Sequence, residues 1–293
     1  MASSDNKSDL VELSLISPNP FPGTGEILNN TLIQAGASPE SLSETHINGK
    51  IIVSAYIRSL PQANLLKRKL AALNLSQVSI RARILRKKDW QERWKKDFYP
   101  FALTQTIDIV PIWRKSKYKP RGKRTPIFID TLTSFGSGLH ETTRFMARLI
   151  ERCRGDFETF FDIGTGTGIL SLVALKCGAG QVNAIDIDRE CLKTAARNFC
   201  LNHCSFDRLR AADIARIKGK NEFDFVAANL VTDDLITAGR NILSFVKPGK
   251  YLAVSGISLE NLNRFKKAFK NLPLRCIKIE KGRLWSALLY KRI

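Results

Sequence analysis

The stretch TFFDIGTGTGIL, residues 159–170, places an acid and three glycines at a spacing that suits ligand binding. Asp162 ends an apolar run, and Gly164, Gly166 and Gly168 follow at every second position. Glycines at such a turn let the backbone approach a ligand closely, and the helix that follows offers its free N–H groups there. The pattern predicts a ligand with a nucleoside part. A dinucleotide, a nucleotide and S-adenosylmethionine all remain candidates.

The glycine spacing does not match the dinucleotide fingerprint. A G-x-G-x-x-G motif that starts at Gly164 would need a third glycine where the chain has Ile169. Asp186 ends the next expected strand, where its carboxylate can accept hydrogen bonds from both hydroxyls of a ribose. Asp188 is the better cap for the helix that follows. Asp213, at the end of LRAAD, is either an adenine contact or a turn residue.

From residue 159 onward the sequence alternates between expected strands and helices, and these elements hold the glycine turn and Asp186 in place. The expected strands cover 159–164, 181–188, 207–213, 223–230 and 250–258, and the expected helices cover 168–178, 189–203, 233–247 and 259–271. Such alternation builds a doubly wound parallel sheet that binds ligands at the carboxyl ends of its strands. Two last strands, 274–282 and 283–292, meet at Gly282 and should be antiparallel. That ending is usual for S-adenosylmethionine-dependent methyltransferases and unusual for dehydrogenases.

Residues 10–90 predict a separate small unit in which the order is strand, helix, strand, strand, helix, strand. This order is the ferredoxin-like pattern, which has many uses and therefore says little about function. Residues 91–126 are expected to form a basic linker, and residues 127–293 the main domain.

Around the start of this linker, Trp90, Trp94 and Phe98 follow one another at the spacing of a helix face. A packing face is favoured over a platform for stacking bases. Seven cations follow within eleven residues: Arg114, Lys115, Lys117, Lys119, Arg121, Lys123 and Arg124. They form either a solvated loop or a tongue that contacts phosphates, and both interpretations stay open.

The whole chain of 293 residues carries 47 Lys and Arg against 27 Asp and Glu, a formal net charge of +20. This excess favours a polyanionic neighbour, most simply RNA or an RNA–protein particle, although it also fits a basic protein that is merely soluble. No apolar run approaches the length needed to span a bilayer, and the polar start lacks the core of a secretory signal. A cytoplasmic monomer without membrane contact is expected.

Six scattered cysteines form no disulfide framework and are interpreted as reduced thiols. Cys200, His203 and Cys204 lie together in CLNHC, but no second ligand cluster follows, and the two cysteines stand at helical spacing. No metal site is therefore predicted.

The segment SFGSGLHETT, residues 134–143, precedes the main domain and leads into an apolar-periodic helix. By itself it could be a helix start capped by Glu141 or Thr142. Together with DWQERWKKDFYPF, the glycine turn, VAANL and KPGKYLAVSGI, it resembles the PrmA-type family, bacterial class I methyltransferases of the large-subunit ribosomal protein L11. The specific motifs cover about residues 85–260. Ser137 replaces the threonine of the family's loop, which is a conservative change.

The resemblance implies the roles of several residues. Thr143 would hold S-adenosylmethionine from the loop, Gly164 and Gly166 would line its methionine part, Asp186 would bind its ribose, and Asn229 would face the transferred methyl group. The implied fold is a Rossmann-like class I methyltransferase sheet with a small ferredoxin-like α+β domain before it. The implied partner is a ribosomal protein of the large subunit, which the small domain would recognise.

The neighbours of Asn229 bear on the methyl acceptor. Enzymes that methylate adenine amino groups or planar amides typically carry Asn/Asp-Pro-Pro-aromatic at this place, whereas this chain has ANLV. A lysine or α-amine is therefore favoured over a flipped, stacked nitrogen. No histidine stands out as a general base. The alternatives are an RNA methyltransferase, which the net charge would suit, and a methyltransferase-like protein that only binds.

Overall fold

The computed structural model describes residues 10–21, 23–37, 41–47, 49–57, 59–73, 75, 77–85, 98–120, 122–130 and 138–293. The chain divides into two compact units, Met1–Asp97 and Phe98–Ile293. Trp90 and Trp94, together with residues 134–137 of the SFGSGLHETT segment, lie outside the described residues. No described helix is both long and apolar enough to cross a membrane.

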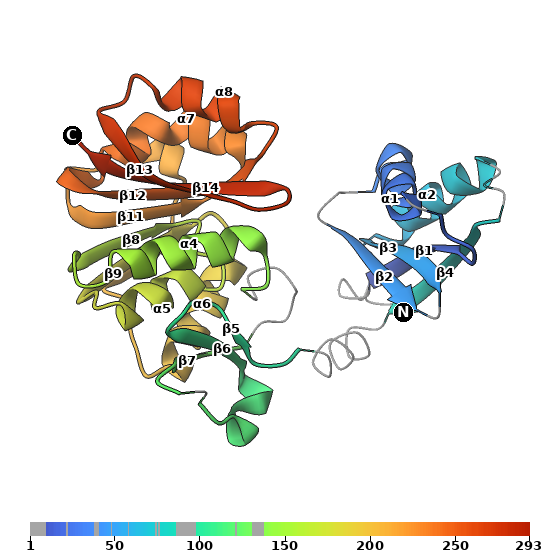
Figure 1. Ribbon diagram of the computed structural model, residues 1–293, viewed down its shortest axis with the longest axis horizontal. Helices are drawn as coiled ribbons and strands as arrows, with labels where there is room; N and C mark the ends of the chain where they lie inside the picture. Colours follow the sequence, from blue (N-terminus) through green and yellow to red (C-terminus); the bar gives the residue numbers. More distant parts are fainter. Residues whose placement is uncertain are drawn as a thin grey trace, which may run out of the picture. The chain divides into compact units, whose positions relative to one another are not determined.

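The N-terminal unit has the expected ferredoxin-like fold. Its elements are β1 (Leu10–Ser17), α1 (Thr24–Ala35), β2 (Leu42–Ile47), β3 (Lys50–Ile57), α2 (Leu60–Ala72) and β4 (Ser79–Leu85). The antiparallel sheet has the order β2-β3-β1-β4, and both helices cover one of its faces (Figure 1). Leu13 of β1, Leu32 of α1 and Leu70 of α2 are fully buried between sheet and helices.

Local signals set the helix ends in this unit. Helix α1 ends at Gly36, whose φ of 113° is a left-handed conformation that glycine adopts without strain. Helix α2 begins after Ser59, whose hydroxyl accepts a hydrogen bond from the N–H of Gln62, and Pro61 occupies its first turn.

The second unit is built on a sheet of seven strands. These are β8 (Thr159–Ile163), β9 (Gln181–Asp186), β10 (Arg208–Ala211), β11 (Phe223–Asn229), β12 (Val246–Ser258), β13 (Leu274–Lys281) and β14 (Trp285–Arg292). The order is β10-β9-β8-β11-β12-β14-β13. The first five strands in this order are parallel, and β14 is antiparallel to both β12 and β13, as the sequence predicted.

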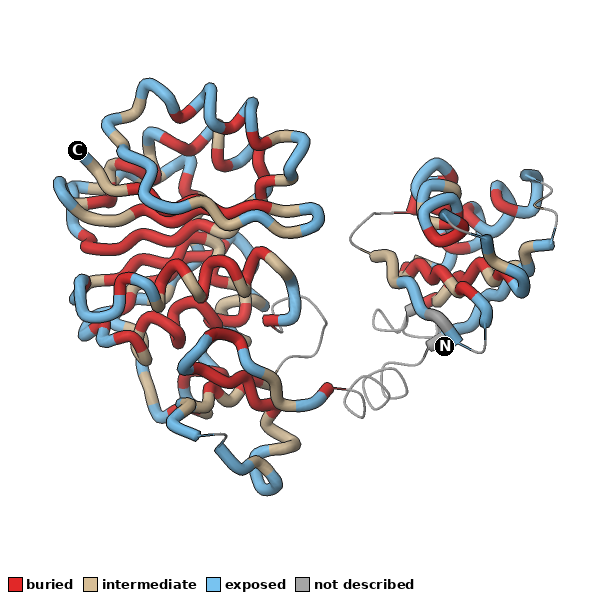
Figure 2. Tube along the Cα trace, in the orientation of Figure 1, coloured by how far each residue is buried: buried red, intermediate tan, exposed pale blue. Residues whose placement is uncertain are grey.

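Helices cover both faces of this sheet. They are α4 (Glu141–Arg152), α5 (Ile169–Lys176), α6 (Arg189–Leu201), α7 (Thr232–Leu243) and α8 (Leu262–Phe269). In Figure 1, α4, α5 and α6 lie on one side and α7 and α8 on the other. The central strands β8 and β11 are buried along nearly their whole length (Figure 2), as is expected of parallel strands with helices on both sides.

The expected linker 91–126 needs correction, because its described part, from Phe98 onward, is folded into the second unit. It forms β5 (Phe101–Ala102), β6 (Ile107–Pro111) and a short 3₁₀ helix, η2 (Ile112–Lys117), and leads into β7 (Thr125–Ile129). These strands make a sheet of their own, in the order β5-β6-β7. All residues of β6 are buried. The many cations nearby hid this short apolar strand in the sequence.

Part of the basic segment is held by contacts within the unit. The guanidinium of Arg114 lies 4.2 Å from the ring centre of Tyr99, and the ammonium of Lys115 lies 4.6 Å from that of Phe128. Arg124 donates to the carbonyl of Thr104 at 2.6 Å and pairs with Asp108 at 3.3 Å. These three cations therefore stabilise the small sheet.

Candidate functional site

The site lies where three neighbouring parallel strands end. Strand β8 leads into the glycine turn, β9 ends at Asp186, and β11 ends at Asn229. Because β9, β8 and β11 are adjacent and parallel, their carboxyl ends lie at one edge of the sheet. The structure thus brings together the predicted residues of the glycine turn, Asp186 and Asn229.

The glycine turn needs its glycines for two different reasons. Gly164 has a φ of 72°, which favours glycine, and a Cβ there would lie 2.6 Å from the tip of the Leu230 side chain, which a larger residue would have to push aside. Gly166 has a φ of 56°, and a Cβ there would meet no heavy atom within 4 Å. Its backbone therefore faces open space, as close approach by a ligand requires.

Asp162 is the polar centre beneath this turn. It is 1% exposed, and its Oδ2 accepts hydrogen bonds from the hydroxyls of Ser171 at 2.6 Å and Thr165 at 2.9 Å. Its Oδ1 has no hydrogen-bond partner among the described residues. Burial raises the pKa of Asp162 to about 6, against the hydrogen bonds from Ser171 and Thr165 that lower it.

The Asp162→Asn variant should lose the part of the pH dependence of the unfolding free energy that comes from the titration of Asp162. The carboxyl loses its proton near its ordinary pKa of 3.8 when unfolded, but only near 6 when folded. The folded protein therefore binds more protons in this window, and its stability falls as the pH rises through it. The wild type should lose up to about 3 kcal/mol of unfolding free energy relative to Asp162→Asn across that window. Denaturant titrations of the cofactor-free proteins measure this, with the exposed Asp234→Asn as control. A stability difference that is constant with pH would contradict the assignment.

Asp186 is held in place by backbone amides. Its Oδ2 accepts from the N–H of Gly166 at 2.8 Å, and its Oδ1 accepts from the N–H of Asp188 at 2.9 Å. Asp188 caps α6, as predicted, by accepting from the N–H of Glu190. Each oxygen of Asp186 keeps a lone pair for a further donor. Ile187, which follows Asp186, is 79% exposed and offers an apolar surface beside it.

Asp213 has a structural role. Its Oδ1 accepts from the N–H of Ala215 at 2.9 Å and so caps the 3₁₀ helix η3 (Ile214–Arg216). Its carboxylate also lies 3.5 Å from Arg216. These contacts fit the interpretation as a turn residue, and the contact with adenine stays a prediction.

A polar chain connects Asn229 to the start of α4. Asn229 Nδ2 donates to Thr142 Oγ1 at 3.3 Å, and Thr142 Oγ1 lies 2.7 Å from Nδ1 of His140. The His140 ring lies 5.5 Å, centre to centre, from that of Trp285, in an edge-on arrangement. Thr143, the predicted contact, is 6% exposed within α4, whereas its neighbour Thr142 makes the bond to Asn229.

One expectation about this region is wrong, and one residue beside the site was missed. The cap of α4 is His140, whose Nδ1 accepts from the N–H of Thr142, and not Glu141 or Thr142. Trp285 was not predicted as a site residue, because it stands 145 positions from His140 and only the folding of the final hairpin brings the two together.

The CLNHC segment has a packing role. Asn202 at its centre bonds both backbone groups of Phe128, accepting from the N–H at 2.8 Å and donating to the carbonyl at 2.6 Å. This pair attaches the end of α6 to β7. The described residues contain no group of three or more His, Cys, Asp or Glu side chains that could hold a metal ion.

The comparisons with known proteins agree on one family. The family model described as ribosomal protein L11 methyltransferase (PrmA) matches residues 26–293. A ribosomal protein L11 methyltransferase from Desulforapulum autotrophicum is 31% identical over 243 residues, which cover 81% of this chain and 79% of the relative. A relative of the same name from Streptococcus equi subsp. zooepidemicus is 28% identical, with 91% and 92% of the two chains covered.

A solved structure supports the same conclusion. The crystal structure of a ribosomal protein L11 methylase from Lactobacillus delbrueckii subsp. bulgaricus has 28% sequence identity and a TM-score of 0.60, and the match covers 67% of this chain and 98% of that one. The predicted class I methyltransferase fold and S-adenosylmethionine as cofactor are confirmed. The chain belongs to the family of ribosomal protein L11 methyltransferases.

Proposed function

We propose that this protein transfers methyl groups from S-adenosylmethionine to amino groups of ribosomal protein L11, on lysine side chains or at the amino terminus. The observation that carries the proposal is the polar chain Asn229–Thr142–His140 beside the glycine turn. It places an amide side chain at the end of β11, and the described residues that follow it directly, Leu230 and Val231, carry no aromatic ring. The proposal takes the protein to act as a cytoplasmic monomer.

The residues around the turn fit S-adenosylmethionine. The open backbone at Gly166 and the turn at Gly164 suit its methionine part, and the unpartnered oxygen of Asp162 can accept from an ammonium group directly or through water. Asp186 keeps two lone pairs for ribose hydroxyls. Thr143 would support the bound cofactor from the start of α4.

The acceptor amine would be held at Asn229. Because Asn229 Nδ2 is engaged by Thr142, its Oδ1 can accept a hydrogen bond from an amine N–H and so direct the nitrogen lone pair. S-adenosylmethionine supplies an electrophilic methyl group on sulfur. The protein then contributes alignment of the amine with the methyl group.

His140 stabilises this arrangement in its neutral form. Burial lowers the pKa of His140 below its ordinary 6.5, although the charge of Glu141 opposes the shift. A neutral ring whose proton is on Nε2 can accept the Thr142 hydroxyl proton at Nδ1. Thr142 Oγ1 is then oriented to accept from Asn229.

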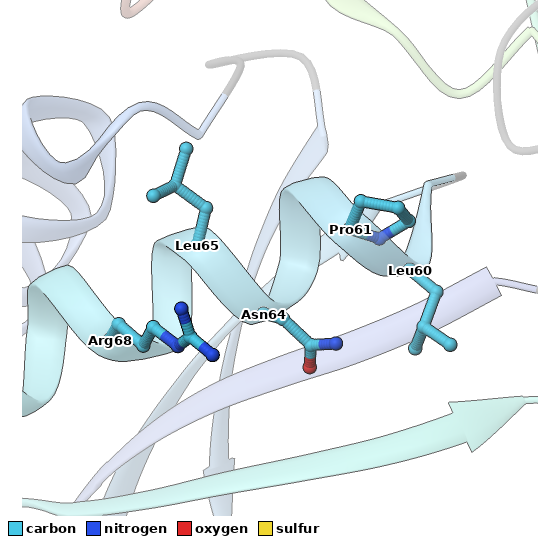
Figure 3. Close-up of a pocket in the computed structure, with 5 residues that line it drawn as sticks. All are labelled: Leu60, Pro61, Asn64, Leu65 and Arg68. Atoms are coloured by element: carbon cyan, nitrogen blue, oxygen red, sulfur yellow. The ribbon is translucent and has the colours of Figure 1, made fainter.

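We assign recognition of the substrate protein to the N-terminal unit. Helix α2 carries a shallow hollow of about 350 Å³ that is lined by Leu60, Pro61, Asn64, Leu65 and Arg68 (Figure 3). Leu60 and Leu65 are 50% and 55% exposed, and apolar side chains next to a polar amide and a cation are typical of protein contacts.

Mass spectrometry of ribosomal proteins from cells with and without the gene tests the proposed function. Loss of methyl groups, in steps of one methyl mass, from ribosomal protein L11 in the deletion strain is expected. Full methylation of ribosomal protein L11 in both strains would contradict the proposal.

The net charge favours a second, accessory activity, which is contact with RNA through the basic segment. Lys117, Lys119 and Lys123 are exposed and make no ion pair with described residues, unlike Arg124.

Replacing the three lysines with glutamine should make the binding of single-stranded RNA less dependent on salt. The slope of the logarithm of the binding constant against the logarithm of the salt concentration should fall in magnitude by about 2, since each phosphate contact contributes about 0.7. Fluorescence anisotropy measures the slope. The matched control removes three exposed lysines in α8 or directly after it: Lys266, Lys267 and Lys270. An equal slope change in both variants would refute a specific role for the segment.

A further inference from the structure

The carboxylate of Glu141 makes a long-range contact that the proposed chemistry does not use. Its Oε1 accepts from the N–H of Arg283 at 3.0 Å, and its Oε2 accepts from the N–H of Leu284 at 3.4 Å. Arg283 and Leu284 form the turn between β13 and β14, which closes through a bond from Gly282 N–H to the carbonyl of Trp285 at 2.9 Å. One side chain thus joins the start of α4 to the tip of the final hairpin.

The carboxylate of Glu141 packs closely against the backbone of the β13–β14 turn. A Cβ at Gly282 would lie 2.2 Å from Oε1 of Glu141, so this glycine leaves the room that the carboxylate occupies. The position next to Glu141 is His140, and the position next to Leu284 is Trp285. The contact therefore lies next in sequence to the His140 and Trp285 rings, whose centres are 5.5 Å apart.

We propose that Glu141 is a positioning residue that fixes the β13–β14 turn against α4 and thereby builds one wall of the acceptor entrance from Trp285. The proposal rests on the proposed function in one respect, the placement of the acceptor beside Asn229. His140 connects this wall to the rest of the polar chain, because its ring lies against that of Trp285 and its Nδ1 lies against the hydroxyl of Thr142. A displaced hairpin would widen the acceptor entrance and leave the glycine turn and Asp186 in place.

An ordinary explanation of Glu141 is that an acid in the first turn of a helix stabilises the helix dipole. Two variants separate this explanation from the proposal. Glu141→Asp keeps the negative charge but shortens the side chain by one methylene, so the carboxylate no longer reaches the turn. Glu141→Gln loses the charge but keeps an oxygen at the same reach, and so can still accept from one of the two amides.

Steady-state methyl transfer to ribosomal protein L11 tests the proposal. Glu141→Asp should raise the KM for the acceptor protein about tenfold, with kcat and cofactor affinity changed less than about twofold, because a displaced wall removes contacts that the acceptor makes equally in the ground state and in the transition state. Glu141→Gln should stay closer to the wild type. Glu222→Asp is the matched control, since Glu222 also accepts a backbone amide, that of Lys220, away from the site.

A fluorescence measurement tests, without any activity assay, whether Glu141 holds the β13–β14 turn in place. The fluorescence of Trp285 is obtained for each protein by subtracting the emission of the same protein with Trp285→Phe. In Glu141→Asp this emission should shift to longer wavelength and be quenched more strongly by acrylamide than in the wild type. The proposal is overturned if Glu141→Asp behaves like the wild type while Glu141→Gln is impaired, or if both variants match Glu222→Asp. If the wild type does not methylate the ribosomal protein at all, the proposed function fails, while the fluorescence result still stands for or against the contact.

Discussion

Replacing Asp186 with alanine is expected to weaken the binding of S-adenosylmethionine by roughly 1–3 kcal/mol, or about 5- to 150-fold, because it removes charge-assisted hydrogen bonds to the ribose. The two backbone amides that now orient the carboxylate, those of Gly166 and Asp188, make the acceptor geometry rigid before the ligand arrives. Isothermal calorimetry with the cofactor measures the loss directly. Asp186→Asn, which keeps one oxygen acceptor, should fall between the wild type and the alanine variant.

A matched control separates cofactor binding from folding in this experiment. Asp207 also accepts a backbone amide, that of Val182 at 2.7 Å, but it lies near the amino end of β9 instead of the carboxyl end. Asp207→Ala should lower the unfolding free energy without changing cofactor affinity. Unchanged cofactor binding in Asp186→Ala would show that the ribose lies elsewhere.

Replacing Asp224 with alanine is expected to lower the free energy of unfolding by about 3–5 kcal/mol, because it leaves a buried network without its acceptor. The carboxylate is 6% exposed and accepts from the N–H groups of Glu158 and Thr159 at 3.1 and 3.0 Å. It also pairs with Lys247 at 3.1 Å. One side chain of β11 thus holds the starts of both neighbouring strands, and denaturant titration measures its loss.

The pH dependence of this effect has a definite sign. Burial alone would raise the pKa of Asp224, but the hydrogen bonds from Thr159, Lys247 and Glu158 outweigh it and hold the pKa below its ordinary value of 3.8. A lowered pKa stabilises the folded protein above the ordinary value, and this stability is lost as the pH falls below it. The difference between wild type and Asp224→Ala should therefore shrink in acid. The exposed Asp234→Ala is the control, and a loss below about 1 kcal/mol at pH 7 would contradict the account.

Patterns with a short period predicted most of the fold. The alternation of strands and helices after residue 159 gave the parallel sheet, and the turn at Gly282 gave its antiparallel ending. The ferredoxin-like order of residues 10–85 followed from the same kind of signal. The glycine turn and Asp186 were predictable because consecutive parallel strands place their carboxyl ends together.

Contacts between distant residues were not predictable in this way. Glu141 meets the turn before Trp285 across more than 140 positions, and no local pattern indicates which hairpin a first-turn acid will contact. The basic segment was expected to be a linker because its charges dominate the composition. Buried β6 and the ring contacts of Arg114 and Lys115 show that such charges can cover a small sheet.

Transfer of labelled methyl groups in a purified system shows whether ribosomal protein L11 is the methyl acceptor. The protein is incubated with large ribosomal subunit components and methyl-labelled S-adenosylmethionine near the wild-type Kd. Label is counted separately in ribosomal protein L11 and in RNA, with Asp186→Ala as the control that binds the cofactor more weakly. Label is expected in ribosomal protein L11, on amino groups, and it should be strongly reduced with Asp186→Ala. Label that is found only in RNA, and that survives protease treatment, would contradict it.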